Sequence, residues 1–232
     1  MDSYERFRQP ITRSSGYDPI PPKPRLVAAK RRAAETGKRL TGQAAPAGAR
    51  RLPPGQELVT DFPRLDLGTR PLLDAESWTL TWGGLCRSPG RVDWPGFNAF
   101  GPEESVTDIH CVTGWSRFDN RWRGISMSKL LNRAQPLTEA THVIFKGHDG
   151  YGTALSIADL RREDVLLATH WEGRPLARDH GGPVRLMVPH LYFWKSAKWV
   201  KQIWFTKGDP GGYWENRGYH HRGDPWKEER YG

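Results

Sequence analysis

One of the chain's two cysteines, Cys111, lies in the stretch DIHCVTGWS, between an expected strand and a glycine–tryptophan turn. A thiol at such a place fills the core as a small apolar group, forms half of a disulfide, or binds a metal as a thiolate. Zinc is disfavoured, because the sequence has no CxxC pair and no H-x₃₋₅-H motif beside a cysteine. The other cysteine, Cys86, lies in the turn-like GLCRSPG and is interpreted as a structural thiol.

Two further stretches hold residue types that bind anions. In DHGGPVR, His180 and Arg185 flank Gly-Gly-Pro, and glycine lets the backbone approach a ligand closely. An arginine at this position can bind a phosphate through two parallel hydrogen bonds. In YFWKSAKW, Ser196 and Lys198 add a donor and a charge. The alternative interpretation is a polar turn followed by an edge strand with solvated lysines.

The elements that would position these residues are short strands separated by Gly and Pro. Alternating apolar residues and turn signals predict strands over 77–82, 105–111, 141–147, 152–157, 183–189 and 197–205. A hairpin is expected over 165–176, a helical turn over 157–164, and a short helix within 125–136 that Pro136 stops. The tail from 206 onwards is aromatic and glycine-rich, without a regular period. The predicted class is α+β, mostly β with short helices.

The charge is unevenly distributed. Residues 1–52 hold 12 of the 35 Lys and Arg residues but only 4 of the 26 Asp and Glu residues. This segment therefore carries a net charge of +8, out of a formal net charge of +9 for the whole chain. We therefore expect a basic, largely disordered arm over 1–52, with a short helix at 25–35, and one domain over 53–232. No apolar run reaches the ~20 residues of a membrane span, and no signal sequence is evident, so a cytoplasmic protein is expected.

Six ordered stretches together resemble the molybdenum-cofactor domain of the sulfite oxidase family, in its bacterial form that consists of this domain alone. They are RLPPGQ, FPRLDLG, DIHCVTGWS, HGGPVRL, VPHLYFWKSAKWV and GYHHRGDPWKEER, and they cover about residues 53–230. A more distant resemblance is to the catalytic subunit of methionine-sulfoxide reductase. The resemblance implies a sulfite oxidase-type fold and a Mo–molybdopterin cofactor.

The resemblance also implies roles for single residues. Cys111 becomes the protein's ligand to molybdenum, in keeping with the preference of a soft metal for thiolate. Other residues are implied to contact the cofactor, chiefly its phosphate: His180, Arg185, Ser196, Ala197 and Lys198, then Asp149 and His148 of FKGHDG, and, as weaker matches, Thr60, Asp61 and Phe62. Tyr219 of the tail falls where the family has a tyrosine near the metal.

The chain departs from sulfite oxidases after the cysteine, where Val112-Thr113-Gly114-Trp115 replaces their pattern and Arg117 is the nearest arginine. Arg117 is expected to orient a small polar or anionic substrate. The implied reaction is oxygen-atom transfer at a Mo=O centre, on sulfite or a small S- or N-oxide, by a monomer with an external electron donor or acceptor. The alternative is a nucleic-acid-binding module that uses the basic arm and the 11 tryptophans.

Overall fold

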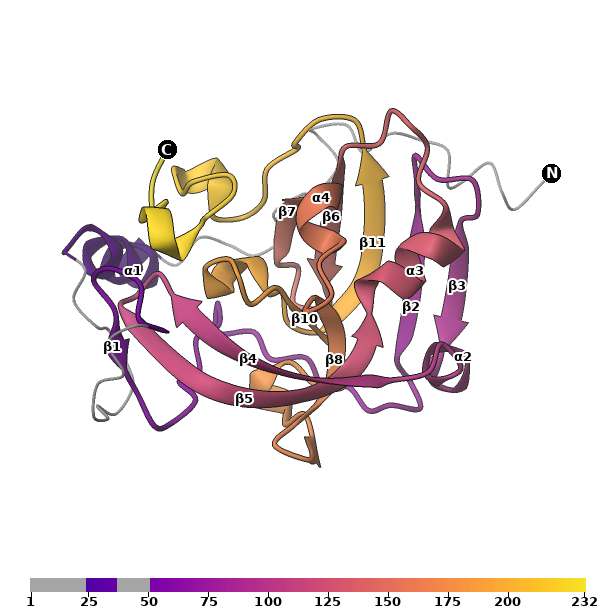
Figure 1. The fold of residues 1–232 in the computed structure, drawn as a ribbon, viewed down its shortest axis with the longest axis horizontal. Helices are drawn as coiled ribbons and strands as arrows, with labels where there is room; N and C mark the ends of the chain where they lie inside the picture. The colour runs from indigo at the N-terminus through magenta and orange to yellow at the C-terminus, as the bar shows by residue number, and fades with distance from the viewer. Residues whose placement is uncertain (1–23, 37–50) are drawn as a thin grey trace.

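The computed structural model describes residues 24–36 and 51–232, which form two β-sheets with short helices between and beside them (Figure 1). This architecture confirms the predicted α+β class. The helices of this part of the chain are α1 (Pro24–Thr36), α2 (Trp94–Asn98), α3 (Met127–Ala134) and α4 (Ile157–Leu160). None of these helices is long and apolar enough to cross a bilayer.

The first sheet carries Cys111. Among the described residues its strand order is β1–β5–β8–β10, with β4 beside β5 and β9 beside β8. The strands are β1 (Glu57–Leu58), β4 (Glu103–Cys111), β5 (Trp115–Ser126), β8 (Leu166–Trp171), β9 (Arg174–Pro175) and β10 (Arg185–Met187). Strands β4 and β5 form a long, curved hairpin along one side of the molecule (Figure 1).

The second sheet has the order β3–β2–β11–β6–β7 within the described chain. Its strands are β2 (Thr79–Gly84), β3 (Gly90–Asp93), β6 (His142–Gly147), β7 (Gly152–Ser156) and β11 (Val200–Thr206). Central β11 pairs parallel with β2 and antiparallel with β6, so the last strand of the chain is inserted between earlier ones. The large core between the sheets includes Trp78, Phe97 and Phe145, each fully buried.

Short polar side chains begin three of the helices. Carboxylate Asp93 accepts a hydrogen bond from Gly96 N at 3.0 Å before α2, and Ser156 Oγ accepts one from Asp159 N at 3.0 Å before α4. Ser126 caps α3 in the same way. Each cap satisfies a backbone N–H that has no partner in the first turn of a helix.

Most of the predicted strands are present, and so are the hairpin (β8–β9) and the helices at 127–134 and 157–160. Strand β5 is the main omission, although it is the longest strand. Its alternation is broken at Asp119, where φ is +55°. The tail after β11 contains only two 3-10 turns, Glu215–Arg217 and Pro225–Lys227, within the described residues.

The predicted short helix of the arm is confirmed as α1, whereas residues 1–23 and 37–50 of that arm lie outside the described residues. Helix α1 packs against the rest of the molecule through Ala33 and Ala34, and Ala34 belongs to the large core. In Figure 1 the helix lies beneath the C-terminal segment. The boundary between arm and domain at 52/53 stays a prediction.

Candidate functional site

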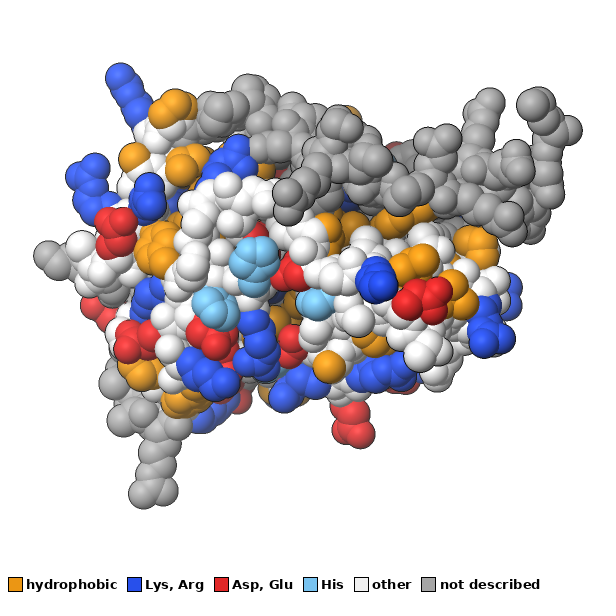
Figure 2. Space-filling model, turned by 90° about the horizontal axis from the view of Figure 1, so that it is seen from above, with side chains coloured by type: hydrophobic (Ala, Val, Ile, Leu, Met, Phe, Trp, Pro, Cys, Tyr) orange, Lys and Arg blue, Asp and Glu red, His pale blue; other side chains and the backbone are white. Residues whose placement is uncertain are grey.

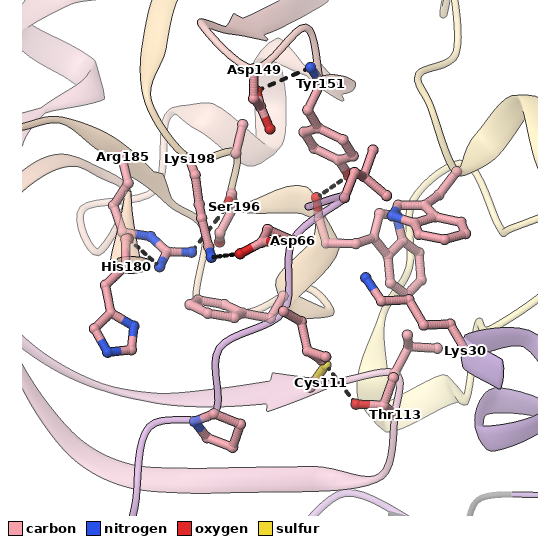
Figure 3. A pocket seen from close by; sticks show the side chains of 18 of the residues that line it. Lys30, Asp66, Cys111, Thr113, Asp149, Tyr151, His180, Arg185, Ser196 and Lys198 are labelled. Atoms are coloured by element: carbon pink, nitrogen blue, oxygen red, sulfur yellow. Dashed lines mark hydrogen bonds and ion pairs between the residues drawn. The ribbon is translucent and has the colours of Figure 1, made fainter. Parts of the chain in front are cut away.

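A cavity lies where the end of β4 meets the loops around β10 and the start of β11. Side chains from six separated segments line it: α1, the 62–67 loop, the 111–115 turn, the 149–151 turn, the 180–199 segment and the tail. Much of its wall is aromatic, including Phe62, Trp115, Tyr151, Phe193, Trp194, Trp199, Trp214 and Tyr219. Figure 3 shows the labelled polar side chains converging on this space.

Cys111 ends β4, and its side chain faces the cavity. Its Sγ lies 3.1 Å from Thr113 Oγ1, and Gly114, at φ +85°, returns the chain into β5. The turn is fixed from two sides, because Gln56 Nε2 donates to the Cys111 carbonyl at 3.1 Å and Arg230 Nη1 donates to the Val112 carbonyl at 2.8 Å. Burial raises the pKa of the Cys111 thiol, and the hydrogen bond from Thr113 opposes that rise.

A group of three cationic side chains, His180, Arg185 and Lys198, lines another part of the cavity; we call it the cationic cluster. The guanidinium of Arg185 donates to the His180 carbonyl at 2.9 Å and to the Ser196 carbonyl at 3.0 Å. Lys198 Nζ donates to the Asp179 carbonyl at 2.7 Å. Backbone carbonyls therefore orient both cations while leaving most of their charge unneutralised.

The side chains of the cationic cluster are largely shielded from solvent. Burial lowers the pKa of Lys198 to about 7, that of His180 to about 4 and that of Arg185 to about 9. The neighbouring carboxylate of Asp66 is 4.0 Å from Lys198 Nζ and is closer to Arg70, at 2.8 Å. Burial also raises the pKa of Asp149 to about 6. The electrostatic balance of this part of the cavity favours an anion.

Two atoms of the cationic cluster are unsatisfied. Among the described residues, His180 Nδ1 and Arg185 Nε are buried without a hydrogen-bond partner. Buried polar atoms of this kind are costly unless something pairs with them, and an anion with several oxygens would accept from both. Together with a thiol on the same cavity, the donor set fits a ligand that has a phosphate group and a soft metal.

Comparison with known proteins agrees with this geometry. Residues 67–214 match the family described as "Oxidoreductase molybdopterin binding domain". The chain belongs to this family. It is therefore a molybdopterin-binding oxidoreductase, and the residues that match the family include both Cys111 and the cationic cluster.

The relatives of this chain differ in how much of their own length aligns with it. "Uncharacterized oxidoreductase YuiH" of Bacillus subtilis is 44% identical over 182 residues, which cover 78% of this chain and 92% of that protein. "Protein-methionine-sulfoxide reductase catalytic subunit MsrP" of Xanthomonas axonopodis is 29% identical over 160 residues, 62% of this chain and 49% of that protein. The chain thus spans about half the length of the methionine-sulfoxide reductase relatives.

A solved structure shares the fold of this molybdopterin-binding oxidoreductase. "Sulfane Dehydrogenase SoxCD from Paracoccus pantotrophus" superposes with a TM-score of 0.56 at 20% identity, over 61% of this chain and 41% of that chain. At that identity the likeness concerns the fold alone. It is consistent with the sulfite oxidase-type fold that the sequence motifs imply.

Most of the residues predicted for the site do line the cavity: Cys111, Phe62, Asp149, His180, Arg185, Ser196, Ala197, Lys198 and Tyr219. Phe62 stacks on the His180 ring, with centroids 4.1 Å apart. The backbone N–H of Ser196 is already bonded to the Phe193 carbonyl at 3.1 Å. Its hydroxyl oxygen accepts from Val188 N at 3.0 Å, which leaves the hydroxyl hydrogen to donate.

Four predicted residues do not line the cavity: Thr60, Asp61, Arg117 and His148. Arg117 lies on β5, pairs with Glu172 at 3.3 Å and stacks over Trp171 at 4.7 Å. Its Nε donates to the Thr60 carbonyl at 3.3 Å, so these two predicted residues contact each other outside the cavity. His148 precedes Asp149 in the same turn, and its backbone N–H donates to the Trp199 carbonyl.

Several lining residues were not predicted from the sequence, above all Lys30, Asp66, Thr113 and Tyr151. Thr113 lies two residues after the cysteine, a spacing that could have indicated a hydrogen bond to sulfur. Tyr151 Oη donates to the Trp194 carbonyl at 2.7 Å and so joins the 149–151 turn to the cavity wall. Lys30 gave no signal, because it lies in a basic stretch that was expected to be an arm.

The nucleic-acid alternative loses its structural basis. Of the 11 tryptophans, all of them in the described part of the chain, only Trp226 is exposed. On the face shown in Figure 2, Lys and Arg side chains stand beside Asp, Glu and His rather than forming a uniform basic surface. Stacking of bases needs accessible rings, and among the tryptophans only Trp226 offers one. Most of the basic arm on which the alternative also rests lies outside the described residues.

Both cysteines are free thiols, so no disulfide joins Cys86 to Cys111. Cys86 is buried in the large core, and burial raises the pKa of its thiol to about 11. Cys86 does not line the cavity that holds Cys111, so it lies apart from the other candidate site residues. The interpretation of Cys86 as a structural thiol agrees with these surroundings.

Proposed function

We propose that this chain catalyses oxygen-atom transfer with a molybdenum cofactor, on sulfite or a small S- or N-oxide. In the proposal Cys111 Sγ is the protein's ligand to the metal, and the cationic cluster binds the phosphate of the molybdopterin. One observation carries it: a thiol and, 69 or more residues further along the chain, a histidine, a buried arginine and a lysine line one cavity. When bound, the cofactor supplies the exchange of one oxygen atom and two electrons.

The chain's own residues have three tasks. Cys111 offers a soft donor from a turn that Gln56 and Arg230 hold rigid. The cationic cluster offers charge and unpaired N–H groups to phosphate oxygens. The aromatic wall excludes water, which strengthens each electrostatic contact inside the cavity. Ser196 and Asp149 lie beside the cluster as further polar contacts.

Two directions of the reaction are compatible with the site. Oxidation converts sulfite and water into sulfate, two protons and two electrons. Reduction converts an S-oxide, two protons and two electrons into a sulfide and water. The names of the MsrP relatives, methionine-sulfoxide reductases at 28–29% identity, support the second direction.

The electrons require a partner. The 232 residues contain only two cysteines, too few for the four thiolates of a common iron–sulfur cluster, and no CxxCH haem motif. We therefore propose an external electron donor or acceptor. The cytoplasmic location and the monomeric state remain predictions from the sequence.

Elemental analysis tests the proposal. Protein produced in a host that makes the cofactor should contain about one molybdenum per chain. Cys111→Ser should retain the pterin through its phosphate while turnover with a dye as electron carrier is lost. Cys86→Ser is the matched control and should keep both metal and turnover. A folded wild-type protein without molybdenum, or an active Cys111→Ser variant, would refute the assignment.

A further inference from the structure

A fourth cation enters the cavity from helix α1. Lys30 is only 8% exposed and lines the same cavity as Cys111 and the cationic cluster. It precedes residues 67–214, the part of the chain that matches the family. The contribution of α1 to the site therefore comes from outside the family's shared domain.

Packing fixes where Lys30 points. Ala33 and Ala34, one turn further along the helix, are buried against the rest of the molecule. The Tyr231 hydroxyl donates to the Arg31 carbonyl at 2.8 Å, and the Arg31 guanidinium lies 5.9 Å from the Tyr231 ring. These contacts fix the helical turn that follows Lys30, and this turn directs the Lys30 side chain into the cavity.

The surroundings of Lys30 lack a counter-charge. Its Nζ lies 4.9 Å from the centroid of the Trp214 ring, and no salt bridge to it is formed by the described residues. Asp66, the nearest carboxylate with an electrostatic effect on it, is paired with Arg70 at 2.8 Å. Burial lowers the pKa of Lys30, and the electrostatic effects of Cys111 and Asp66 oppose that change. Lys30 lines the same cavity as Cys111 and Thr113.

The position of Lys30 separates it from the cationic cluster. In Figure 3 its amino group and the side chains of His180, Arg185 and Lys198 lie on opposite sides of Asp66 and Cys111. One phosphate cannot be the partner of cations on both sides. The cluster accounts for the cofactor's phosphate, and Lys30 is left for another negative group near the sulfur.

We propose that Lys30 is the substrate-binding cation of this enzyme and that its natural substrate is a small oxoanion. This inference rests on the proposed function and deepens it, because it selects sulfite-like anions over neutral S- and N-oxides. An ammonium has three donors and binds an oxoanion by charge-assisted hydrogen bonds. The Trp214 ring beneath it stabilises the cation between turnovers.

The binding experiment uses the molybdenum-loaded protein and inorganic sulfate, which the enzyme cannot oxidise. Tryptophan fluorescence reports occupancy, since Trp214 adjoins Lys30. Lys30→Met should raise the dissociation constant of sulfate about 10- to 100-fold. Lys30→Arg should restore most of the affinity. Arg32→Met, which removes the same charge from an exposed position of α1, should change it less than about twofold.

Steady-state kinetics distinguishes an anionic substrate from a neutral one. With sulfite, Lys30→Met should raise KM by a similar factor while the molybdenum content and melting temperature stay near the wild-type values. With neutral dimethyl sulfoxide and a reduced dye, KM should stay within about twofold. Equal losses on both substrates, unchanged sulfate affinity, absence of sulfate binding by the wild type, or loss of molybdenum from Lys30→Met would overturn the inference.

The two proposals fail in distinguishable ways. If the wild type holds molybdenum but turns over neither substrate, the proposed reaction fails, and the sulfate titration still decides the role of Lys30. If sulfite turnover is normal in Lys30→Met, the proposed reaction stands and Lys30 has no part in substrate binding.

Discussion

The cationic cluster and the Cys111 side of the cavity (Lys30, Thr113, Trp214 and Tyr219) are built in different ways. The cluster comes from a span of 19 residues, 180–198, and local backbone carbonyls orient it. The Cys111 side comes from α1, the β4–β5 turn and the tail, which are remote in sequence and meet only in the folded chain. The proposed phosphate site is therefore carried by one short segment, whereas the proposed substrate side depends on contacts between segments that are far apart in the sequence.

The largest expected effect concerns Arg185, the most buried member of the cluster. Arg185→Met should lower the molybdenum content of purified protein about 30-fold or more, because the phosphate loses its main partner and two carbonyls lose their donor. Metal analysis measures it, with exposed Arg161→Met as the control. Wild-type metal content in Arg185→Met would show that the cluster does not bind the cofactor.

Lys198 allows a pH test of the cluster in cofactor-free protein. Its pKa is about 7 in the fold and near 10.5 when unfolded, so between these values the unfolded chain binds more protons. The free energy of unfolding should therefore rise as the pH rises from 7 to about 10, by up to about 3 kcal/mol from this residue. Denaturant titrations should show that part of the rise missing in Lys198→Met. Parallel pH profiles in both proteins would argue against a buried, uncompensated Lys198.

The hydrogen bond between Thr113 and Cys111 allows a test of the Cys111 side of the cavity. In a cofactor-free Cys86→Ser background, Thr113→Val should slow alkylation of Cys111 by iodoacetamide about 2- to 10-fold at pH 8, because loss of the hydrogen bond raises the thiol pKa further. Thr113→Ser keeps the hydroxyl and should react at the wild-type rate. Faster alkylation of the valine variant would mean that the contact only shields the sulfur.

The smallest effect is expected at Arg117. Arg117→Gln should change molybdenum content and the KM for sulfite by less than about twofold, since the side chain is paired with Glu172 outside the cavity. A tenfold rise in KM would restore Arg117 to the substrate site and would imply that β5 moves toward the cavity during turnover.

The difference between the two regions also determines what the sequence could reveal. His180, Arg185 and Lys198 were predicted because the stretches HGGPVRL and VPHLYFWKSAKWV resemble those of the sulfite oxidase family; the residue types alone left a polar turn with solvated lysines as an alternative. Lys30 was not, since a helix of Ala, Lys and Arg has the composition of a solvated arm and only Ala33 and Ala34 mark its buried face. Strand β5 was missed for a related reason: charged residues at its outward positions and the turn at Asp119 hide the alternation.

The contacts of Arg230 and Tyr231 have a consequence for biosynthesis. Arg230 donates to the Val112 carbonyl beside Cys111, and Tyr231 holds α1 through Arg31. These two residues leave the ribosome after every other part of the cavity wall. A nascent chain therefore contains the whole cluster before it contains the two residues that hold the 111–115 turn and α1, and we expect the Cys111 side to be the last part of the cavity to form.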